Sequence, residues 1–225
     1  DGRLVQRVSA YVVQEQKDDA PNSLKVNEGI SFKGHDLLGQ GFLFDDSLAL
    51  KGVASPLSAI ESFSDSPAER SRIRPIVGGE ELATATKLGQ ARFAIWLNDL
   101  TLDEAKSQCP RLLDLVERLV RPGREKQNDP GAKTFWWKYL RDRPEMRDAL
   151  QGKGQFLCAP SVSPHLALAM LDADLMPSKQ LAVFALSAFA SLATLQSRVH
   201  EVWARFFASS MKDDLRYTPS DCFET

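Results

Sequence analysis

Hydrophobic and polar positions along the chain follow two periods, one typical of strands and one typical of helices. Short apolar runs bounded by glycine, proline or polar turns predict strands over residues 30–32, 42–44, 72–79, 92–97, 155–159, 165–170 and 180–186. A further strand is expected over residues 4–13, which are rich in β-branched side chains.

Helix signals lie between and after these runs. Ser55-Pro56 opens a short helix, because proline is favoured at the first helical position. Thr101 and Glu104 have the spacing of a capping box, and Pro110 begins a helix with one apolar face. The strongest pattern spans residues 187–209, where apolar side chains recur at three- and four-residue steps: Phe189, Leu192, Leu195, Val199, Trp203 and Phe206.

These elements predict an α+β fold with mixed β-sheets, packed helices and a long C-terminal amphipathic helix. Three regions follow from the pattern: a strand-rich part over 1–54, a mixed α/β core over 55–186, and a helix and turn over 187–225. The chain begins with Asp1-Gly2 rather than methionine and ends directly after a helix-and-turn pattern. We therefore expect residues 1–225 to be a fragment of a longer polypeptide.

Composition places the chain among ordinary globular proteins. Its 225 residues include 28 Lys and Arg against 30 Asp and Glu, and 43% are hydrophobic. No apolar run approaches the roughly 20 residues of a membrane-spanning helix, so no membrane partner is expected. Cys109, Cys158 and Cys222 have neither metal-ligand spacing nor a disulfide pattern, which favours a reducing, cytoplasmic location.

The common catalytic motifs are missing from the sequence. Adjacent carboxylate pairs occur without a nearby histidine, and neither a P-loop nor a dinucleotide-binding glycine motif is present. Ser163 and His165 raise the alternative of an independent hydrolase, which would require a hydrogen-bonded serine–histidine pair. We expect no catalytic residue, no metal site and no bound cofactor in this fragment.

Two features indicate anion binding. Residues 121–143 carry seven basic against three acidic side chains, together with Trp136, Trp137 and Tyr139. These aromatic side chains fit either base stacking or a hydrophobic core. Lys212 and Arg216 follow the last helix, where they fit either phosphate binding or the helix dipole.

Five segments carry a resemblance to a known family. Residues 197–203 and 212–218 are similar to an SR-h-H-x-x-W helix followed by a K-x-D-h-R-Y turn. Residues 72–82, 92–97 and 156–163 are similar to three strand segments of the same family, in the same order. Together they resemble the target-recognition domain of MmeI-like single-chain restriction–modification enzymes and related adenine-specific DNA methyltransferases.

The resemblance implies a module that reads double-stranded DNA and belongs to the same chain as a methyltransferase domain. That domain would transfer a methyl group from S-adenosylmethionine to adenine N6, with or without a nuclease, in phage defence. The family's F-x-G-x-G-like turn and [ND]-P-P-[YF] loop are absent from residues 1–225. The fragment itself is therefore expected to bind DNA without methylating it.

Candidate DNA contacts fall into two sets. Phosphate contacts are expected from basic and hydroxyl side chains: Arg72, Arg74, Lys212, Arg216 and Tyr217. For Arg74 an ion pair with Glu80 or Glu81 is the alternative. Base reading is expected from polar side chains that border the late strands: Ser161, Ser163, His165, Ser178, Lys179 and Gln180.

The competing function is a protein-interaction module that docks through the long apolar helix. An exposed apolar face on that helix would favour docking, whereas a buried face would not.

Overall fold

The computed structural model describes residues 22–84, 92–211 and 214–225. The strand predicted over residues 4–13 and the predicted phosphate contact Lys212 lie outside these ranges.

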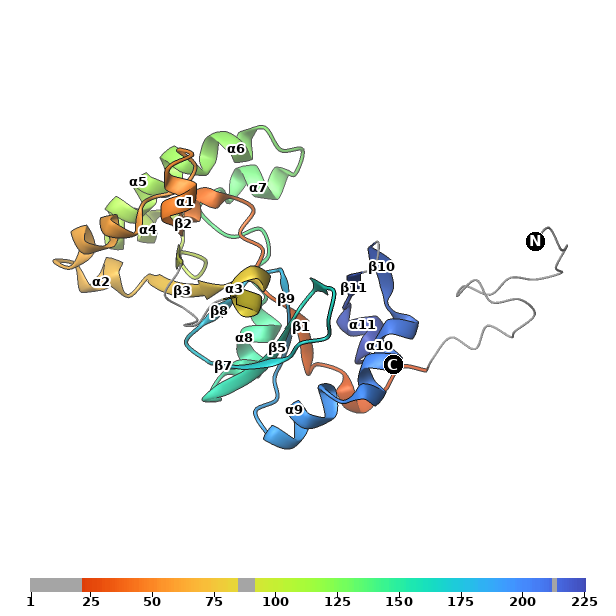
Figure 1. Cartoon of the computed structure of the whole chain (residues 1–225). Helices are drawn as coiled ribbons and strands as arrows, with labels where there is room; N and C mark the ends of the chain where they lie inside the picture. The colour runs from red at the N-terminus through yellow and green to blue at the C-terminus, as the bar shows by residue number, and fades with distance from the viewer. Residues whose placement is uncertain (1–21, 85–91, 212–213) are drawn as a thin grey trace, which may run out of the picture.

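Three small β-sheets organise the fold (Figure 1). Their strand orders are β1-β9-β5-β7, β2-β4-β3-β8 and β10-β11-β6. All neighbours are antiparallel except β3 and β8, which run parallel. The strands are β1 (Ser31–Lys33), β2 (Leu43–Phe44), β3 (Ile73–Val77), β4 (Phe93–Ile95), β5 (Gln155–Pro160), β6 (Val162–Ser163), β7 (Ala169–Asp172), β8 (Met176–Pro177), β9 (Leu181–Phe184), β10 (Ser209–Met211) and β11 (Asp214–Arg216).

Short helices surround the sheets, which confirms the α+β class. The 3₁₀ helices are η1 (Lys25–Asn27), η2 (Gln40–Phe42) and η3 (Leu57–Phe63). The α-helices are α1 (Asp46–Ala49), α2 (Pro67–Arg70), α3 (Gly79–Thr84), α4 (Leu102–Gln108), α5 (Pro110–Leu119), α6 (Arg121–Glu125), α7 (Pro130–Thr134), α8 (Pro144–Leu150), α9 (Phe189–Leu195), α10 (Arg198–Phe207) and α11 (Pro219–Cys222). Figure 1 shows α4–α7 gathered at one end of the molecule and α9–α11 at the other.

Helix starts follow the local sequence signals. Thr101 Oγ1 accepts a hydrogen bond from the Glu104 N–H, and Glu104 Oε2 accepts one from the Thr101 N–H, so the capping box at α4 is complete. The helix predicted at Pro110 is α5, which buries its apolar stripe. The element expected after Ser55-Pro56 is the 3₁₀ helix η3 rather than an α-helix.

The central strands β5 and β9 of the sheet β1-β9-β5-β7 are buried on both faces. On β5, Leu157 and Ala159 face the hydrophobic cluster under α10 and α11, whereas Phe156 and Cys158 face the cluster that includes Met146 of α8. Successive side chains of a strand point to opposite faces, so a strand covered on both sides needs a continuous apolar run. This explains why residues 155–159 show no alternation.

The aromatic side chains of residues 136–139 belong to the core. Trp137 donates its indole N–H to the Leu100 carbonyl at 3.1 Å, and the Tyr139 hydroxyl donates to the Ile95 carbonyl at 2.7 Å. Trp136 is also buried. Because these rings pack inside the α4–α7 end of the molecule, the core interpretation is confirmed and base stacking by them is excluded.

Two predicted elements differ in the structure. The single helix expected over 187–209 is wrong, because it divides into α9 and α10 at Ser197, whose hydroxyl caps α10 by accepting from the His200 N–H. The strand expected over 165–170 begins only at Ala169. The Gln196 side chain bonds to the Leu166 carbonyl and the Leu168 N–H, and this pairing replaces a strand ladder there.

Candidate nucleic-acid interface

A surface hollow of about 430 Å³ lies between the end of β1, the start of α3, the β8–β9 turn and the strands β6 and β11, and five of the predicted DNA contacts line it. Those five are Ser161, Lys179, Gln180, Arg216 and Tyr217. The hollow is completed by side chains and backbone from β1, α3 and the segments flanking β6 and β11: Lys33, Gly79, Glu80, Val162 and Thr218. We call this set of ten residues the polar hollow.

The turn between β8 and β9 presents two of these side chains. The Leu181 N–H donates to the Ser178 carbonyl at 2.9 Å, which closes the turn over Lys179 and Gln180. Gln180 Oε1 accepts from the Gly79 N–H at 3.3 Å, and the Gln180 carbonyl accepts from the Ser161 N–H at 2.7 Å. The first bond orients the Gln180 amide toward the start of α3, and the second ties the Gln180 backbone to the residue that follows β5.

The backbone of β1 lies against the same turn. A Cβ atom at Gly34 would come within 2.2 Å of the Ser178 carbonyl oxygen, closer than real contacts allow. The Lys179 N–H donates to the His35 carbonyl at 2.8 Å, and the His35 N–H donates to the Pro177 carbonyl at 2.9 Å. Glycine is therefore required at position 34 to seat the turn that presents Lys179.

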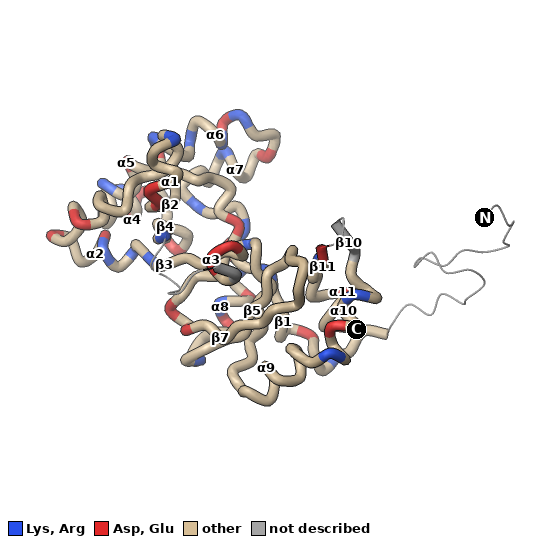
Figure 2. Tube along the Cα trace, in the orientation of Figure 1, with Lys and Arg blue, Asp and Glu red and all other residues tan. Residues whose placement is uncertain are grey.

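Three cations surround the polar hollow: Lys33, Lys179 and Arg216. Lys179 Nζ lies 3.1 Å from Asp36 Oδ1, whereas Lys33 and Arg216 form no ion pair with any other residue of the described ranges. Elsewhere Lys and Arg alternate with Asp and Glu along the trace rather than forming one basic stripe (Figure 2). The polar hollow thus combines local positive charge with a net charge of −2 for the whole chain.

His35 supports the polar hollow from inside the fold. Its ring is 3% exposed and packs edge-on against Trp96 and Tyr139. Burial, with further contributions from Arg147 and Arg74, lowers the pKa of His35 from 6.5 to about 4. The neutral ring is thus the form that the folded protein holds.

Burial of neutral His35 should therefore make the folded protein less stable as the pH is lowered. In the unfolded chain the ring takes up a proton near pH 6.5, whereas the folded protein resists protonation down to about pH 4. The contribution is complete above pH 6.5 and is lost between pH 6.5 and 4, amounting to at most about 3 kcal/mol. Urea unfolding at pH 7 and pH 5 should show a smaller pH effect in His35→Phe than in the wild type. The same substitution at the exposed His165 should leave the pH effect unchanged, and an equal loss in all three proteins would contradict the assignment.

The comparisons with known proteins bear on the same region. The sequence model described as "MmeI, target recognition domain" matches residues 54–225. The chain belongs to this family. DNA methyltransferase A of Bacillus subtilis (strain 168) is 26% identical over 144 residues, which cover 61% of this chain and 15% of that protein.

A solved structure shares the fold of this target recognition domain. It is the type IIL restriction-modification enzyme MmeI in complex with DNA, with a TM-score of 0.70 and 16% sequence identity. The match covers 98% of this chain and 28% of the MmeI chain. The match to this chain thus covers less than a third of the length of either relative.

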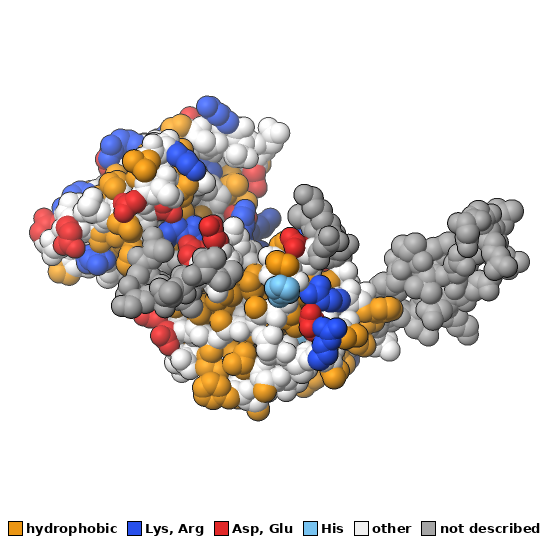
Figure 3. Space-filling model, viewed as in Figure 1, with side chains coloured by type: hydrophobic (Ala, Val, Ile, Leu, Met, Phe, Trp, Pro, Cys, Tyr) orange, Lys and Arg blue, Asp and Glu red, His pale blue; other side chains and the backbone are white. Residues whose placement is uncertain are grey.

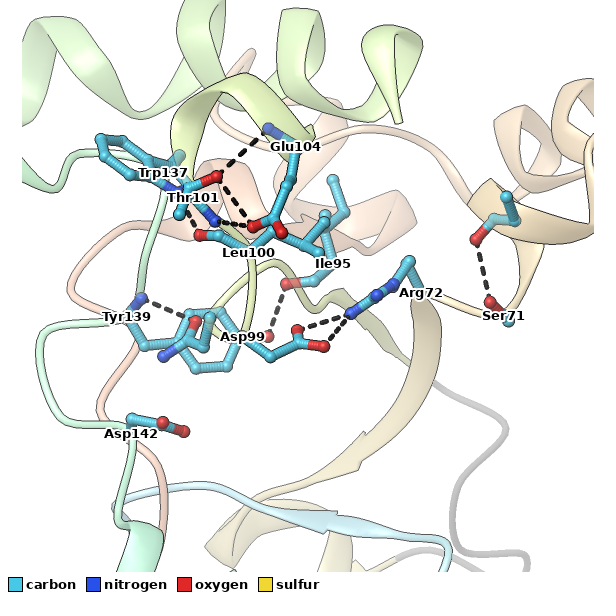
Figure 4. Close-up of polar contacts among 12 residues, drawn as sticks. Ser71, Arg72, Ile95, Asp99, Leu100, Thr101, Glu104, Trp137, Tyr139 and Asp142 are labelled. Carbon is cyan, nitrogen blue, oxygen red and sulfur yellow. Dashed lines mark hydrogen bonds and ion pairs between the residues drawn. The ribbon is translucent and has the colours of Figure 1, made fainter. Parts of the chain in front are cut away.

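The two arginines predicted on β3 and just before it lie away from the polar hollow. Arg72 forms a bidentate ion pair with Asp99, whose two carboxylate oxygens are 2.5 and 2.6 Å from Nη1 (Figure 4). The guanidinium of Arg74 lies over the Trp96 ring, 5.4 Å from its centroid, while Glu81 pairs with Arg92 instead. Arg72 thus has a structural partner in the target recognition domain.

Tyr217 lines the polar hollow but not through its hydroxyl. The side chain is 1% exposed, and its hydroxyl lies 2.9 Å from His200 Nε2. Burial raises the pKa of this phenol, so it remains neutral. The Tyr217 hydroxyl therefore already has a side-chain partner inside the fold, and its expected contact with a phosphate stays a prediction.

The serine and histidine candidates occupy different positions. The Ser161 hydroxyl is buried without a hydrogen-bond partner, and Ser178 belongs to the β8–β9 turn beside the polar hollow. Ser163 Oγ accepts from the main-chain N–H of His165 at 3.3 Å, and not from the imidazole ring. The serine–histidine pair that an independent hydrolase requires is therefore not formed by these residues.

Lys33 is the basic residue of the polar hollow that the sequence pattern does not reveal. It ends β1, and its register against Ala182 of β9 brings it beside the β8–β9 turn. The pairing joins segments about 150 residues apart, so no local signal indicates it. The nearby glycine at position 34 is the one hint, because glycine permits the close approach of two backbones.

The described residues form neither a metal site nor a membrane-spanning helix. Among the described residues, no cluster of three or more His, Cys, Asp or Glu side chains is arranged to hold a metal ion. Within the same ranges, no helix has both the length and the apolar character needed to cross a bilayer.

Proposed function

We propose that the polar hollow faces duplex DNA and reads part of a specific target. Lys179 and Gln180 point from one turn, and their side chains match base edges: lysine donates to guanine O6 and N7, and glutamine bridges adenine N6 and N7. Lys33 and Arg216 flank them and hold the backbone phosphates on either side. The observation that carries this proposal is the convergence of three cations and one fixed amide in a single hollow of a target recognition domain.

The geometry supports base reading by Lys179 and Gln180 and phosphate binding by Lys33 and Arg216. Gln180 is held by the Gly79 N–H, so its amide is oriented before DNA arrives, and little side-chain freedom is lost on binding. Lys33 and Arg216 have no acidic partner in the described ranges, so binding a phosphate breaks no existing ion pair. Lys179 must exchange Asp36 for a base edge, and this exchange favours a base that offers two acceptors over one that offers a single acceptor.

The chemistry of the longer chain is part of the same proposal. We place S-adenosylmethionine and the transfer of its methyl group to adenine N6 in a methyltransferase domain of the parent polypeptide, in the cytoplasm and in defence against phage. This chain contributes position and sequence choice rather than catalysis. Its three buried free cysteines accord with a reducing compartment.

Selection from a pool of random duplexes tests base reading. Lys179→Ala should change the base preferred at one position of the enriched target, reducing discrimination there by about 10- to 100-fold. Sequencing of the bound duplexes measures this change. Lys126→Ala, which removes an exposed lysine from the far end of the molecule, is the matched control and should enrich the wild-type target.

Two results would overturn the proposal. If the wild type and Lys179→Ala enrich the same target, Lys179 does not read a base. If the wild-type parent enzyme enriches no target at low salt, the protein does not recognise a DNA sequence.

A further inference from the structure

The apolar face of α10 is exposed to solvent. Val199 is 81% exposed, Val202 55% and Phe206 54%. This exposure is what the protein-interaction alternative requires, but no described segment covers the face, and so the described residues identify no partner for it. The polar groups that line a different cavity carry a more specific inference.

That cavity has a volume of about 410 Å³ and lies beside α6 and α7. The charged and amide side chains that line it are Asn98, Arg124, Asp129, Lys138, Arg141 and Asp142. At the α4–α7 end of the molecule, the visible face carries Lys and Arg interspersed with Asp and Glu (Figure 3). Surface charge alone therefore does not mark a binding site there, and the argument depends on buried groups. We call this cavity the arginine pocket.

Arg124 is a buried cation without a carboxylate partner. The residue is 2% exposed, and its Nη2 donates to the main-chain carbonyls of Leu37 at 2.7 Å and Lys138 at 3.0 Å. Its Nε is buried without a hydrogen-bond partner, and no carboxylate of the described residues forms an ion pair with the guanidinium. Burial lowers the pKa of Arg124, and the charges of Asp36 and Asp129 offset this only in part. A buried charge without a counter-charge is unfavourable, and a bound anion would supply one.

Asn98 adds a second unpaired donor to the arginine pocket. The residue is 7% exposed, and its Oδ1 accepts from the Tyr139 N–H at 3.0 Å. This bond leaves the two N–H groups of the Asn98 amide without an acceptor among the described residues. Two buried side chains that line one cavity thus both lack acceptors for their N–H groups.

The two carboxylates of the arginine pocket already have partners. Asp129 caps the start of α7, and Asp142 Oδ2 lies 3.1 Å from Arg147 Nη2. Lys138 and Arg141, by contrast, form no ion pair with any residue that the structure describes. Unpaired cations beside unpaired N–H donors match the chemistry of an oxyanion, whose oxygens accept several charge-assisted hydrogen bonds.

We propose that the arginine pocket binds one phosphate-like oxyanion. Arg124 and Asn98 donate hydrogen bonds to its oxygens, and Lys138 and Arg141 add positive charge. The oxyanion supplies the counter-charge that Arg124 lacks inside the fold. Binding to the arginine pocket requires no DNA.

The phosphate comes either from solution or from the backbone of bound DNA, and the second source rests on the proposed function. Asp36 places the arginine pocket next to the polar hollow. Its main-chain N–H and carbonyl pair with those of Arg141, each at 3.1 Å, while its side chain pairs with Lys179. A DNA strand held at Lys179 would therefore pass close to Arg141.

Titration of the 225-residue chain with inorganic phosphate, in the absence of DNA, tests the proposal. Calorimetry at constant ionic strength, with chloride balancing the phosphate, should show saturable binding by the wild type. Replacing both Lys138 and Arg141 by alanine should weaken this binding at least tenfold, because the arginine pocket loses two of its three cations. Replacing Lys126 and Lys133 is the matched control, since both are exposed at the same end of the molecule and neither lines the pocket.

Arg124→Gln removes the buried charge and should abolish phosphate binding. If that variant does not fold, the variant at Lys138 and Arg141 still decides the question. No saturable binding by the wild type would overturn the proposal, and so would wild-type affinity in the variant at Lys138 and Arg141.

A further variant separates the arginine pocket from the proposed function. Replacing Lys33 and Arg216 of the polar hollow should leave phosphate binding intact. If phosphate binding is lost in this variant and retained in the one at Lys138 and Arg141, phosphate binds in the polar hollow and the proposal is wrong. If no duplex binds at all, the proposed function fails, whereas the phosphate titration still tests the pocket.

Duplex binding distinguishes the two sources of the phosphate. If a DNA phosphate occupies the arginine pocket, free phosphate should compete with the duplex. The variant at Lys138 and Arg141 should then show a slope of log affinity against log salt that is shallower by about 0.9. If free phosphate is the ligand, that slope should equal the wild-type slope, and the DNA-bound protein should bind phosphate as tightly as the free protein does.

Discussion

Gly34→Val should destabilise the domain by about 3 kcal/mol and displace the turn that carries Lys179. The added Cβ would lie 2.2 Å from the Ser178 carbonyl oxygen and 2.5 Å from that of Pro177. Both atoms belong to the backbone, so no side-chain rotation relieves the overlap, and β1 must separate from the turn. Urea unfolding measures the loss of stability, and duplex binding measures the displacement of the polar hollow.

Gly154→Val is the control for this substitution. A Cβ at Gly154 meets no atom within 4 Å, so the change in unfolding free energy there should stay below about 1 kcal/mol. Similar losses at both glycines would mean that the close approach at Gly34 does not hold the turn.

Glu69→Ala should produce the largest loss of stability, about 3–5 kcal/mol. Glu69 is 2% exposed and joins α2 to the start of α5. Its carboxylate accepts from the Arg111 N–H at 2.8 Å, the Leu112 N–H at 3.2 Å and Arg111 Nε at 2.6 Å. Alanine leaves these N–H donors without an acceptor. Removing one partner of a buried pair costs more free energy than replacing both partners by apolar groups. Chemical denaturation measures the effect.

Asp103→Ala provides the comparison, since Asp103 is exposed and pairs only with Lys106 on the surface of α4. Its loss should not exceed about 0.5 kcal/mol. If Glu69→Ala costs no more than Asp103→Ala, the link between α2 and α5 contributes little to the fold.

Local sequence signals account for the elements that depend on neighbours along the chain. Thr101 and Glu104 bond to each other within one turn, so their spacing predicts the start of α4 correctly. The predicted element boundaries are wrong where a residue that is distant in the sequence determines the backbone conformation. Gln196 bonds to the backbone at Leu166 and Leu168, and this tertiary contact shifts the start of β7. The break at Ser197 had a local signal, a serine cap, which the apolar periodicity on both sides obscured.

The same distinction applies to the polar hollow. Lys179 and Gln180 were predictable because they are polar residues in a turn between two apolar strands. Lys33 was not, because its place depends on a pairing between β1 and β9. The contact of the Tyr217 hydroxyl inside the fold was not predictable either, because it depends on His200, which α10 brings near from elsewhere in the chain. The apolar periodicity also cannot show whether the apolar face of α10 points to the core or to solvent. A buried helix face and an exposed docking face require the same apolar residues at the same spacing.

The salt dependence of duplex binding tests the central claim most directly. The measurement compares the wild type with a variant that replaces Lys33, Lys179 and Arg216 by alanine, and with a control that replaces the exposed Lys51, Arg118 and Lys126. If the polar hollow holds DNA, the slope of log affinity against log salt should become shallower by up to about 1.8 in the first variant, because the two phosphate contacts of Lys33 and Arg216 each contribute about 0.9. The control should keep the wild-type slope. Equal slopes in all three proteins, with binding retained, would show that DNA is held by another face of the domain.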